Sequence, residues 1–448
     1  MSFTPHLRRL LIALLVGLWL LPQARADVTL LLEEPYSYDG SFAGTGHTAI
    51  YLSRVCAETP TDLRRCLPGE PGVVLSRYHG VAGYDWLAIP LIPYLYAVER
   101  PEEIPLVADA KIVAALRDHY RREHFANMIP DSPTGEMPGG NWYELVGSAY
   151  DRTIYGYQVE TSEEKDDEFI AAYNADTNRM KYKLVTRNCA DFVREAVNFY
   201  YPKAVGRSFL ADLEVTTPKH AAKSLVKFAH KHPELQLSTF VVPQVPGAMK
   251  RSTPVHGVVD SIFKEKKYEV PLLVFHPFVA VGIGLDYWIS GRFNPAKNAL
   301  VVSPDGTAQP PLTSDQRRAY AKGLRELLDA EPGKNPEDTV PTWKQFQAKA
   351  HLRFDAEGQP FLEGQFEDKT ITIGLSRSNV LTASSQSELT REMLVSRLRE
   401  ELRKGHAPKI SDAQLRSDWK LLKSAIPADQ EIAKPRVTLS AVSADSTD

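Results

Sequence analysis

The chain of 448 residues contains little cysteine, only three residues, and lacks the patterns that point to a cofactor or a nucleic acid. We find no internal repeat, no glycine-rich phosphate loop and no spacing of metal ligands, so the sequence predicts no cofactor and no metal site. An excess of basic residues is also lacking, since the formal net charge is -3 at pH 7. Binding of nucleic acid is therefore not expected. The apolar content of 43% is ordinary and supports a globular core.

The N-terminal segment has the three parts of a secretory signal peptide. Arg8 and Arg9 precede an apolar run over residues 10–21, and the small-residue sequence ARA follows at 24–26. The apolar run is shorter than the ~20 residues that a membrane-spanning helix needs, which favours a cleaved signal over an uncleaved anchor. We expect cleavage after Ala26 and export to the periplasm or the medium. Loss of the three arginines of this segment changes the formal charge from -3 to -6.

In an exported chain each of the three cysteines is informative. Cys56 and Cys66 flank a short segment, and their separation suits a local disulfide worth roughly 3 kcal/mol on the chain-entropy model. Cys189 is then left over. An odd thiol in an oxidising compartment is either reactive or deeply buried. Pairing of Cys189 with one of the other two cysteines would remove this argument.

The stretch from Lys181 to Pro202, KYKLVTRNCADFVREAVNFYYP, places Cys189 at the start of a predicted helix. Residues 180–184 alternate between apolar and polar as a half-buried strand does, and the spacing becomes helical after Asn188. Asn188 is a good N-cap, an acidic residue follows in the first turn, and the proline ends the helix. The sequence therefore predicts a strand that leads directly into the cysteine helix.

A thiol at a helix N-terminus is expected to have a lowered pKa, because unpaired N–H groups and the helix dipole stabilise the thiolate. This stabilisation is about 0.3 to 2 kcal/mol, roughly one pK unit, which does not make a nucleophile at neutral pH. A base is therefore needed. The alternative interpretation is that Cys189 only packs its helix against a sheet, since free cysteine is among the most buried residue types.

The sequence GHTAIYL supplies a histidine that could serve as this base. His47 to Leu52 has the pattern of a strand buried on both faces, and its position after glycines suits a residue that lines a cleft. The alternative is a core histidine that hydrogen-bonds a backbone carbonyl. A further strand is predicted from Val73 to Tyr78, and it ends at His79.

Beyond residue 204 the sequence pattern is less informative. Residues 270–285 form the most apolar part of the mature chain, but Pro271 and Pro277 interrupt them, which favours a buried hairpin or wall over a membrane-embedded or interfacial segment. Further along, the patterns predict helices over 314–330, 388–404 and 411–426, a hairpin over 361–375 and a disordered tail from 435.

Two short motifs resemble a known family. A histidine strand that precedes a cysteine helix is the order expected of the circularly permuted papain-like fold. GHTAIYL resembles the histidine strand, and TRNCADFV the Asn-Cys helix start, of the permuted NlpC-like superfamily, which includes the lecithin-retinol acyltransferase group. Residues 150–193, with YDRTIYGYQVE and YKLVTRNC, are similar to the Lnb-type periplasmic domain associated with lipoprotein transacylation. The resemblance covers about residues 28–202.

This resemblance implies an α+β, circularly permuted papain-like domain with Cys189 as nucleophile and His47 as base. By position, His79 matches the third polar residue of the relatives, and Asp85 is its substitute. Asn188 is a further candidate for orienting the ring or holding an oxyanion. The oxyanion would be held by backbone N–H groups at the helix start, including that of Cys189.

The domain division follows from the resemblance and the patterns together. We expect a signal peptide at 1–26, the papain-like domain at 27–204 and an extension with the apolar segment at 205–310. A mainly helical C-terminal region at 311–434 and the tail at 435–448 complete the chain.

The leading hypothesis is an exported cysteine-dependent acyl-transfer enzyme, a transacylase or a hydrolase, that works through a thioester on an envelope lipid or lipoprotein ester. Peripheral contact with a membrane belongs to this hypothesis. The sequence lacks the membrane spans that follow the domain in lipoprotein transacylases, and it lacks a cell-wall binding repeat. An NlpC-like hydrolase that cleaves a peptidoglycan amide is the first alternative. The second is a non-catalytic envelope binding or scaffold protein that keeps a degenerate thiol-enzyme fold.

Overall fold

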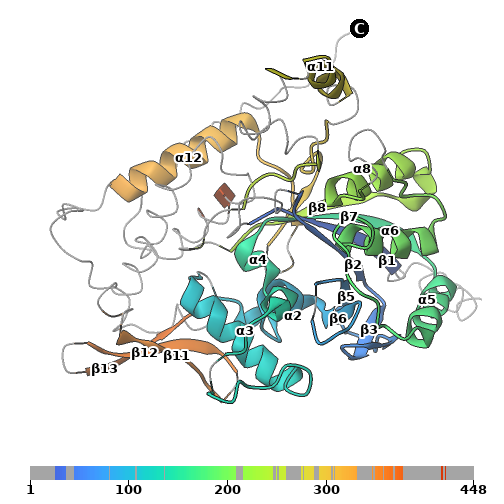
Figure 1. The fold of residues 1–448 in the computed structure, drawn as a ribbon. Helices are drawn as coiled ribbons and strands as arrows, with labels where there is room; N and C mark the ends of the chain where they lie inside the picture. The colour runs from blue at the N-terminus through green and yellow to red at the C-terminus, as the bar shows by residue number, and fades with distance from the viewer. Residues whose placement is uncertain are drawn as a thin grey trace, which may run out of the picture.

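The computed structural model is an α+β protein built around one eight-stranded sheet (Figure 1). The strand order is β10-β9-β8-β7-β1-β2-β5-β6, and all neighbours are antiparallel except β8 and β9. The strands are β1 (Ala26–Glu33), β2 (His47–Leu52), β5 (Val73–Ser76), β6 (Leu87–Pro90), β7 (Ile154–Thr161), β8 (Ser238–Val242), β9 (Leu300–Val302) and β10 (Ala308–Gln309).

The structure describes most of the chain between residues 26 and 376. The described residues are 26–36, 45–79, 81–105, 108–135, 137–207, 215–245, 249, 252–258, 274, 275, 277–286, 292–303, 306, 308–329, 346, 349–356, 358–366, 369–376, 415, 416 and 419. The predicted signal peptide before Ala26, the helices predicted at 388–404 and 411–426, and the predicted tail lie outside these residues, apart from 415, 416 and 419.

Both faces of the sheet are covered by helices, which explains why its central strands are apolar at nearly every position. On one face Leu31 and Ala49 pack with α2 (Leu91–Tyr96), α3 (Ala110–His124) and α4 (Ser148–Asp151). On the other face Leu30 and Ile50 pack with α5 (Glu163–Ala175), α6 (Cys189–Tyr200) and α8 (Pro218–Ala229). Neighbouring residues of β1 and β2 therefore belong to different cores, as strand alternation requires.

The main sheet extends past the domain boundary that the sequence predicted at residue 204. Strand β8 pairs with β7, with Ile154 opposite Val242, and β9 and β10 continue the sheet beyond it. The region assigned to a separate extension therefore contributes three strands and α8 to the main domain. The prediction failed because the β7–β8 pairing joins residues 80 to 88 positions apart and the β8–β9 pairing joins residues 60 positions apart, which local patterns do not reveal.

The described C-terminal part contains more β-structure than the predicted helical region. Helix α12 (Ser314–Asp329) is close to the predicted helix at 314–330. The hairpin predicted at 361–375 is confirmed by the pairing of β12 (Pro360–Phe366) with β13 (Lys369–Gly374). Strand β11 (His351–Phe354), which the sequence did not indicate, completes a three-stranded antiparallel sheet.

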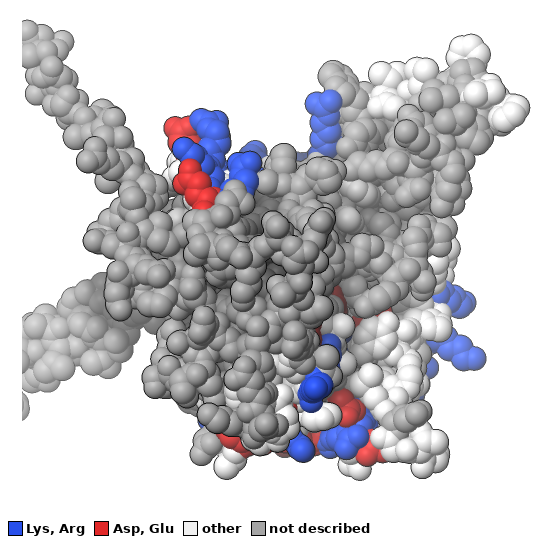
Figure 2. All heavy atoms as spheres, turned by 90° about the vertical axis from the view of Figure 1, so that its left-hand side faces the viewer, with Lys and Arg blue, Asp and Glu red and all other residues white. Residues whose placement is uncertain are grey.

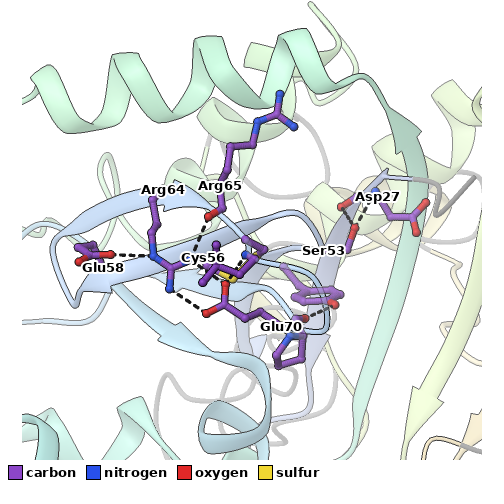
Figure 3. Close-up of a disulfide and its surroundings, with 11 residues drawn as sticks. Asp27, Ser53, Cys56, Glu58, Arg64, Arg65 and Glu70 are labelled. Carbon is purple, nitrogen blue, oxygen red and sulfur yellow. Dashed lines mark hydrogen bonds and ion pairs between the residues drawn. A yellow bond between two sulfur atoms is a disulfide. The ribbon is translucent and has the colours of Figure 1, made fainter.

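The predicted disulfide is present between Cys56 and Cys66, which join the hairpin of β3 (Val55–Thr59) and β4 (Asp62–Arg65) (Figure 3). Beside it, Arg64 forms ion pairs with Glu58 and Glu70, both at 2.7 Å. A disulfide of this kind is compatible with an exported protein in an oxidising compartment. Cys189 is a free, buried cysteine, as expected.

Within the described residues, no helix is both long enough and apolar enough to cross a bilayer. The apolar segment that the sequence assigned to a buried hairpin instead contains a helix, α11 (Pro277–Asp286). Phe278 is 91% exposed and Phe275, just before the helix, is 73% exposed, so this part of the segment is not a buried wall.

Candidate active site

The candidate site lies at one end of the main sheet, where three adjacent strands begin or end. Strand β1 ends at Glu33, β2 begins at His47 directly opposite it, and β5 ends at Ser76. Gly46 allows this arrangement, because its φ of +73° is a left-handed conformation and a Cβ there would lie 2.1 Å from the carbonyl oxygen of Glu33. A cavity of about 750 Å³ opens at this end of the sheet, and His47 and Cys189 both line it.

Cys189 is the first residue of α6, as the sequence predicted. The Asn188 side chain accepts a hydrogen bond from the Asp191 N–H at 2.9 Å, and the Asp191 carboxylate accepts one from the Asn188 N–H at 3.3 Å. This reciprocal capping box fixes the helix start, so the position of the thiol is set by rigid structure. The alternating residues before it do not form the predicted strand. They form a turn closed by Lys183 and Arg187, with Leu184 exposed.

The thiol is not activated in the resting structure. Burial raises the pKa of the Cys189 thiol to about 11, although the backbone N–H groups of Thr48 and Ala190 donate to the sulfur and lower it. The expected net lowering of this pKa at the helix N-terminus is therefore wrong. The reason is that removal of the sulfur from water outweighs the few N–H groups that face it.

The imidazole of His47 is held by two neighbours. Its Nε2 atom lies 2.7 Å from Ser76 Oγ, and its ring stacks on Tyr78 with the centroids 4.3 Å apart. Burial, with a smaller contribution from the Arg152 charge, lowers the pKa of His47 well below 6.5. The ring is therefore neutral at physiological pH, which is the state a general base requires.

His47 and Cys189 approach each other from different sides of the sheet end. By alternation, His47 shares the face of Ala49, whereas α6 packs on the face of Ile50. The sulfur accepts a hydrogen bond from the N–H of Thr48, the residue after His47, so it lies next to the histidine backbone. Both residues are described, and no hydrogen bond joins their side chains. Since Nε2 is occupied by Ser76, Nδ1 is the nitrogen left for the thiol.

The two residues proposed to orient the ring lie elsewhere. His79 is exposed at the cavity wall, where its ring meets the edge of Tyr182 at 5.5 Å. Asp85 is buried and accepts from Arg77 at 2.7 Å and from Arg187 at 2.9 Å. It thus anchors the chain around the start of α6 and does not contact the imidazole.

Asn188 has a structural role that removes it from the oxyanion candidates. Its side-chain NH₂ donates to the carbonyl oxygens of Leu184 at 2.9 Å and of Thr216 at 3.0 Å. Both hydrogens of the amide are thereby used. At the start of α6 the N–H of Ala190 donates to the sulfur and that of Asp191 donates to Asn188, so the backbone N–H of Cys189 is the candidate donor to an oxyanion.

Three residues of the site were not found from the sequence: Ser76, Glu33 and Arg152. Ser76 lies on the same face of the sheet as His47. The alternation of side chains along β5 could have identified it only if the β2–β5 register were known. Glu33 and Arg152 are buried charged residues at the ends of apolar segments, with 0% and 3% exposure. A lone charge at the end of an apolar strand is a weak signal of a site, because most such residues face solvent.

Comparison with known proteins finds no matching family model, no matching curated protein and no matching solved structure. The function is therefore argued from the geometry of the site.

Proposed function

We propose that the chain is an exported cysteine-dependent acyl-transfer enzyme, a transacylase or a hydrolase, with a circularly permuted papain-like catalytic domain of the NlpC-like kind. The observation that carries the proposal is that Cys189 and His47 line one cavity at the sheet end, and that Ser76 contacts the His47 ring. Each comes from a different element with a fixed position. The signal-like N-terminus and the Cys56–Cys66 disulfide support export.

The proposed reaction starts from a neutral thiol and a neutral imidazole. Ser76 Oγ accepts from Nε2–H, which leaves the Nδ1 lone pair free to take the proton of the Cys189 thiol as the sulfur attacks the ester carbonyl carbon. The resulting oxyanion is held by the backbone N–H of Cys189 at the start of α6. When the C–O bond breaks, the imidazolium returns the proton to the leaving alkoxide, and a thioester remains on Cys189.

The second half of the cycle releases the acyl group. Water or an alcohol or amine acceptor attacks the thioester carbonyl, gives a proton to His47 and expels the sulfur, which recovers that proton as a thiol. The raised pKa of the thiol and the lowered pKa of His47 argue against a resting ion pair. Proton transfer therefore has to accompany attack, and the His47 ring has to turn toward the sulfur when substrate is bound.

A lipid or lipoprotein ester is favoured as the acyl donor over a peptidoglycan amide. The cavity wall includes apolar side chains that suit an acyl chain: Leu184, Val185, Val215 and Val258. Such a wall offers few groups for the polar peptide of a cell-wall fragment.

Contact with a lipid surface is part of the proposal, and α11 is the element that supports it. Five large apolar side chains in this part of the chain are more than half exposed: Val274, Phe275, Phe278, Val281 and Leu285. Figure 2 shows a group of white, uncharged atoms at the upper right, with blue Lys and Arg side chains to its left and below it. An exposed apolar patch of this kind marks an interaction site. Residues 270–285 contain no Asp, Glu, Lys or Arg, and the sequence KEKKYE before them has one more lysine than glutamate, which suits insertion into an anionic lipid surface.

One observation favours a non-catalytic binding protein instead. Nε2 of His47 forms a hydrogen bond with Ser76 Oγ and not with the thiol of Cys189. A core cysteine beside a satisfied histidine would look the same.

The test is turnover of matched substrates by the mature protein and by Cys189→Ala. We expect ester cleavage in micelles of a diacyl lipid, no cleavage of muropeptides, and loss of the lipid activity in the variant. Cleavage of muropeptides alone would assign the chain to the peptidoglycan hydrolases. Lack of activity on both would favour the binding protein, and activity that survives in Cys189→Ala would show that Cys189 is not the nucleophile.

A further inference from the structure

A buried arginine lines the same cavity but has no part in the proposed acyl transfer. Arg152 directly precedes β7, which pairs with β1 so that Ile154 lies opposite Glu33. The arginine therefore belongs to the sheet end that carries His47. Its side chain is only 4% exposed.

The guanidinium group of Arg152 is incompletely satisfied by its neighbours. Nη1 lies 3.4 Å from Glu33 and Nη2 lies 4.0 Å from Glu144, and the group sits over the ring of Tyr36 with 4.3 Å to the centroid. Within the described part of the chain Nε has no hydrogen-bond partner, and neither ion pair has hydrogen-bond geometry. The Nε–H donor is thus held out of water without an acceptor, and the two Nη groups have only long ion-pair contacts.

Such an arrangement is costly unless a ligand completes it. A buried polar group without a hydrogen bond loses its hydration and gains nothing in return, and the loss is larger for a charged group. The planar fork of arginine fits the two oxygens of a phosphate or a carboxylate. The open side of this group is the cavity that holds Cys189.

We propose that Arg152, backed by the Tyr36 ring, is the anchor of an anion subsite that receives a phosphate diester or a carboxylate of the acyl donor. This inference rests on the proposed function. It makes Arg152 a specificity-determining residue that places the ester of an anionic donor beside Cys189.

Two carboxylates compete with the ligand for Arg152. Glu33 is fully buried and accepts from Tyr94, whereas Glu144 is partly exposed at the cavity wall. Burial raises the pKa of both carboxyl groups, although the Arg152 charge opposes the rise, so burial weakens the stabilisation of their charged forms. Glu144 can be neutralised without opening the core, which offers a variant that strengthens the subsite.

The experiment measures binding to Cys189→Ala protein, in which no turnover occurs. The probes share one acyl length: dihexanoyl phosphatidylglycerol as phosphate diester, hexanoylglycine as carboxylate and dihexanoylglycerol as neutral ligand, all below their critical micelle concentrations. We expect one of the anions to bind about 10- to 100-fold more tightly than the neutral ligand. The anion that binds identifies the source of the charge.

Variants of Arg152 and Glu144 show whether these residues cause the preference for the anion. Adding Arg152→Gln should abolish the preference for the anion, and Arg152→Lys should retain part of it. Glu144→Gln should tighten anion binding about threefold or more, because it removes a competing negative charge. Arg179→Gln is the matched control, since Arg179 also stacks on a tyrosine, Tyr84 at 3.9 Å, but is exposed outside the cavity.

The inference is overturned if neither anion is preferred, or if a folded Arg152→Gln protein keeps the preference. If Arg152→Gln fails to fold, the test rests on anion binding by Glu144→Gln. Unchanged or weaker anion binding by Glu144→Gln overturns the inference. These outcomes are separable from failure of the proposed function. Absence of a thioester on Cys189 leaves the binding result intact, and absence of the subsite leaves acyl transfer from neutral esters intact.

Discussion

At the scale of single residues, the site is governed by burial more than by the helix terminus. A helix N-terminus contributes about 0.3 to 2 kcal/mol to an anion. The rise of the Cys189 pKa to about 11 shows that loss of water at the sulfur exceeds this contribution. The consequence for the proposed mechanism is a protected thiol that becomes nucleophilic only as His47 removes its proton.

Ser76 is the residue whose role in this mechanism is most easily isolated. Its side chain is buried and contacts Nε2 of His47 at 2.7 Å, so Ser76→Ala removes the partner that holds the ring. We expect kcat/KM for a lipid ester to fall about 3- to 10-fold, as loss of ~0.5–1.5 kcal/mol of hydrogen bonding would produce. Steady-state kinetics on the folded variant measure this.

The pH profile distinguishes positioning of the ring from a general loss of structure. A hydroxyl that accepts from Nε2–H stabilises the protonated ring, so Ser76→Ala should lower the pKa of His47 further and move the acid limb of kcat/KM to lower pH. Ser76→Thr, which keeps the hydroxyl, should retain the wild-type limb. A Ser76→Ala enzyme with wild-type kcat/KM and pH profile would remove Ser76 from the mechanism.

The sequence identified the residues whose role depends on local structure. Cys189 follows an N-cap and precedes helical spacing, and the structure places it at the start of α6. Ser76 and Arg152 were not identified, because their roles come from strand register and from a cavity formed by distant segments. His79 was predicted to orient the ring because it follows a strand. Ser76, on the same face of the sheet as His47, makes the hydrogen bond to the imidazole instead.

At the scale of elements, α6 and α11 show what residue spacing can and cannot predict. The spacing after Asn188 predicts α6, because its apolar stripe and its cap agree. The segment before it fails as a strand, since Met180 and Leu184 are exposed and no strand among the described residues pairs with them. Apolar content likewise could not tell whether residues 270–285 are buried within the chain or face a surface outside it.

The exposed apolar side chains around α11 lead to a prediction about vesicle binding. We expect the mature protein to sediment with vesicles that contain anionic phosphatidylglycerol. Phe275→Ser combined with Phe278→Ser should weaken this binding about 10²- to 10⁴-fold, because burial of each phenylalanine in lipid contributes about 1.5–3 kcal/mol. Co-sedimentation across a range of lipid concentrations measures the change.

The control for this prediction is Leu67→Ser, which removes an exposed apolar side chain (63% exposed) near the Cys56–Cys66 disulfide. It should leave vesicle binding unchanged. Equal binding by the wild type and the double variant would show that α11 does not contact lipid, and a loss in Leu67→Ser would show that the assay reports general hydrophobicity.

At the scale of the whole molecule, the site depends on a sheet that gathers distant parts of the chain. One sheet is formed by strands from three parts of the chain, residues 26–90, 154–161 and 238–309. Helices cover both of its faces, with α4 on one face and α6 on the other. The α+β class followed from the mixture of strand and helix patterns. The extent of the domain did not, because the β7–β8 pairing is visible only once the chain is folded.

This arrangement also explains why a single cavity can serve two purposes in the proposed enzyme. The sheet end brings His47 from β2 and Arg152 from the start of β7 to the thiol of α6. Acyl transfer and recognition of an anion would then be coupled by rigid strands and would need no moving domain. The ring of His47 is the one part of this mechanism that has to turn.

The most direct test of the account is detection of the acyl group on Cys189. Mature protein is mixed with a hexanoyl ester, quenched in acid at short times over a series of pH values, and examined by intact-protein and peptide mass spectrometry. The account predicts a hydroxylamine-sensitive hexanoyl group on Cys189. Its rate of formation should not fall as the pH is lowered to 6.5, because His47 has a pKa well below that value and stays neutral.

In the same experiment His47→Ala should slow acylation about 10²- to 10⁴-fold, as loss of a general base does. Cys189→Ser, with a far weaker nucleophile, should carry no thioester. An unlabelled Cys189 in the wild type would contradict the account and leave the chain as a binding protein, and acylation at an equal rate in His47→Ala would contradict the role of His47 as base.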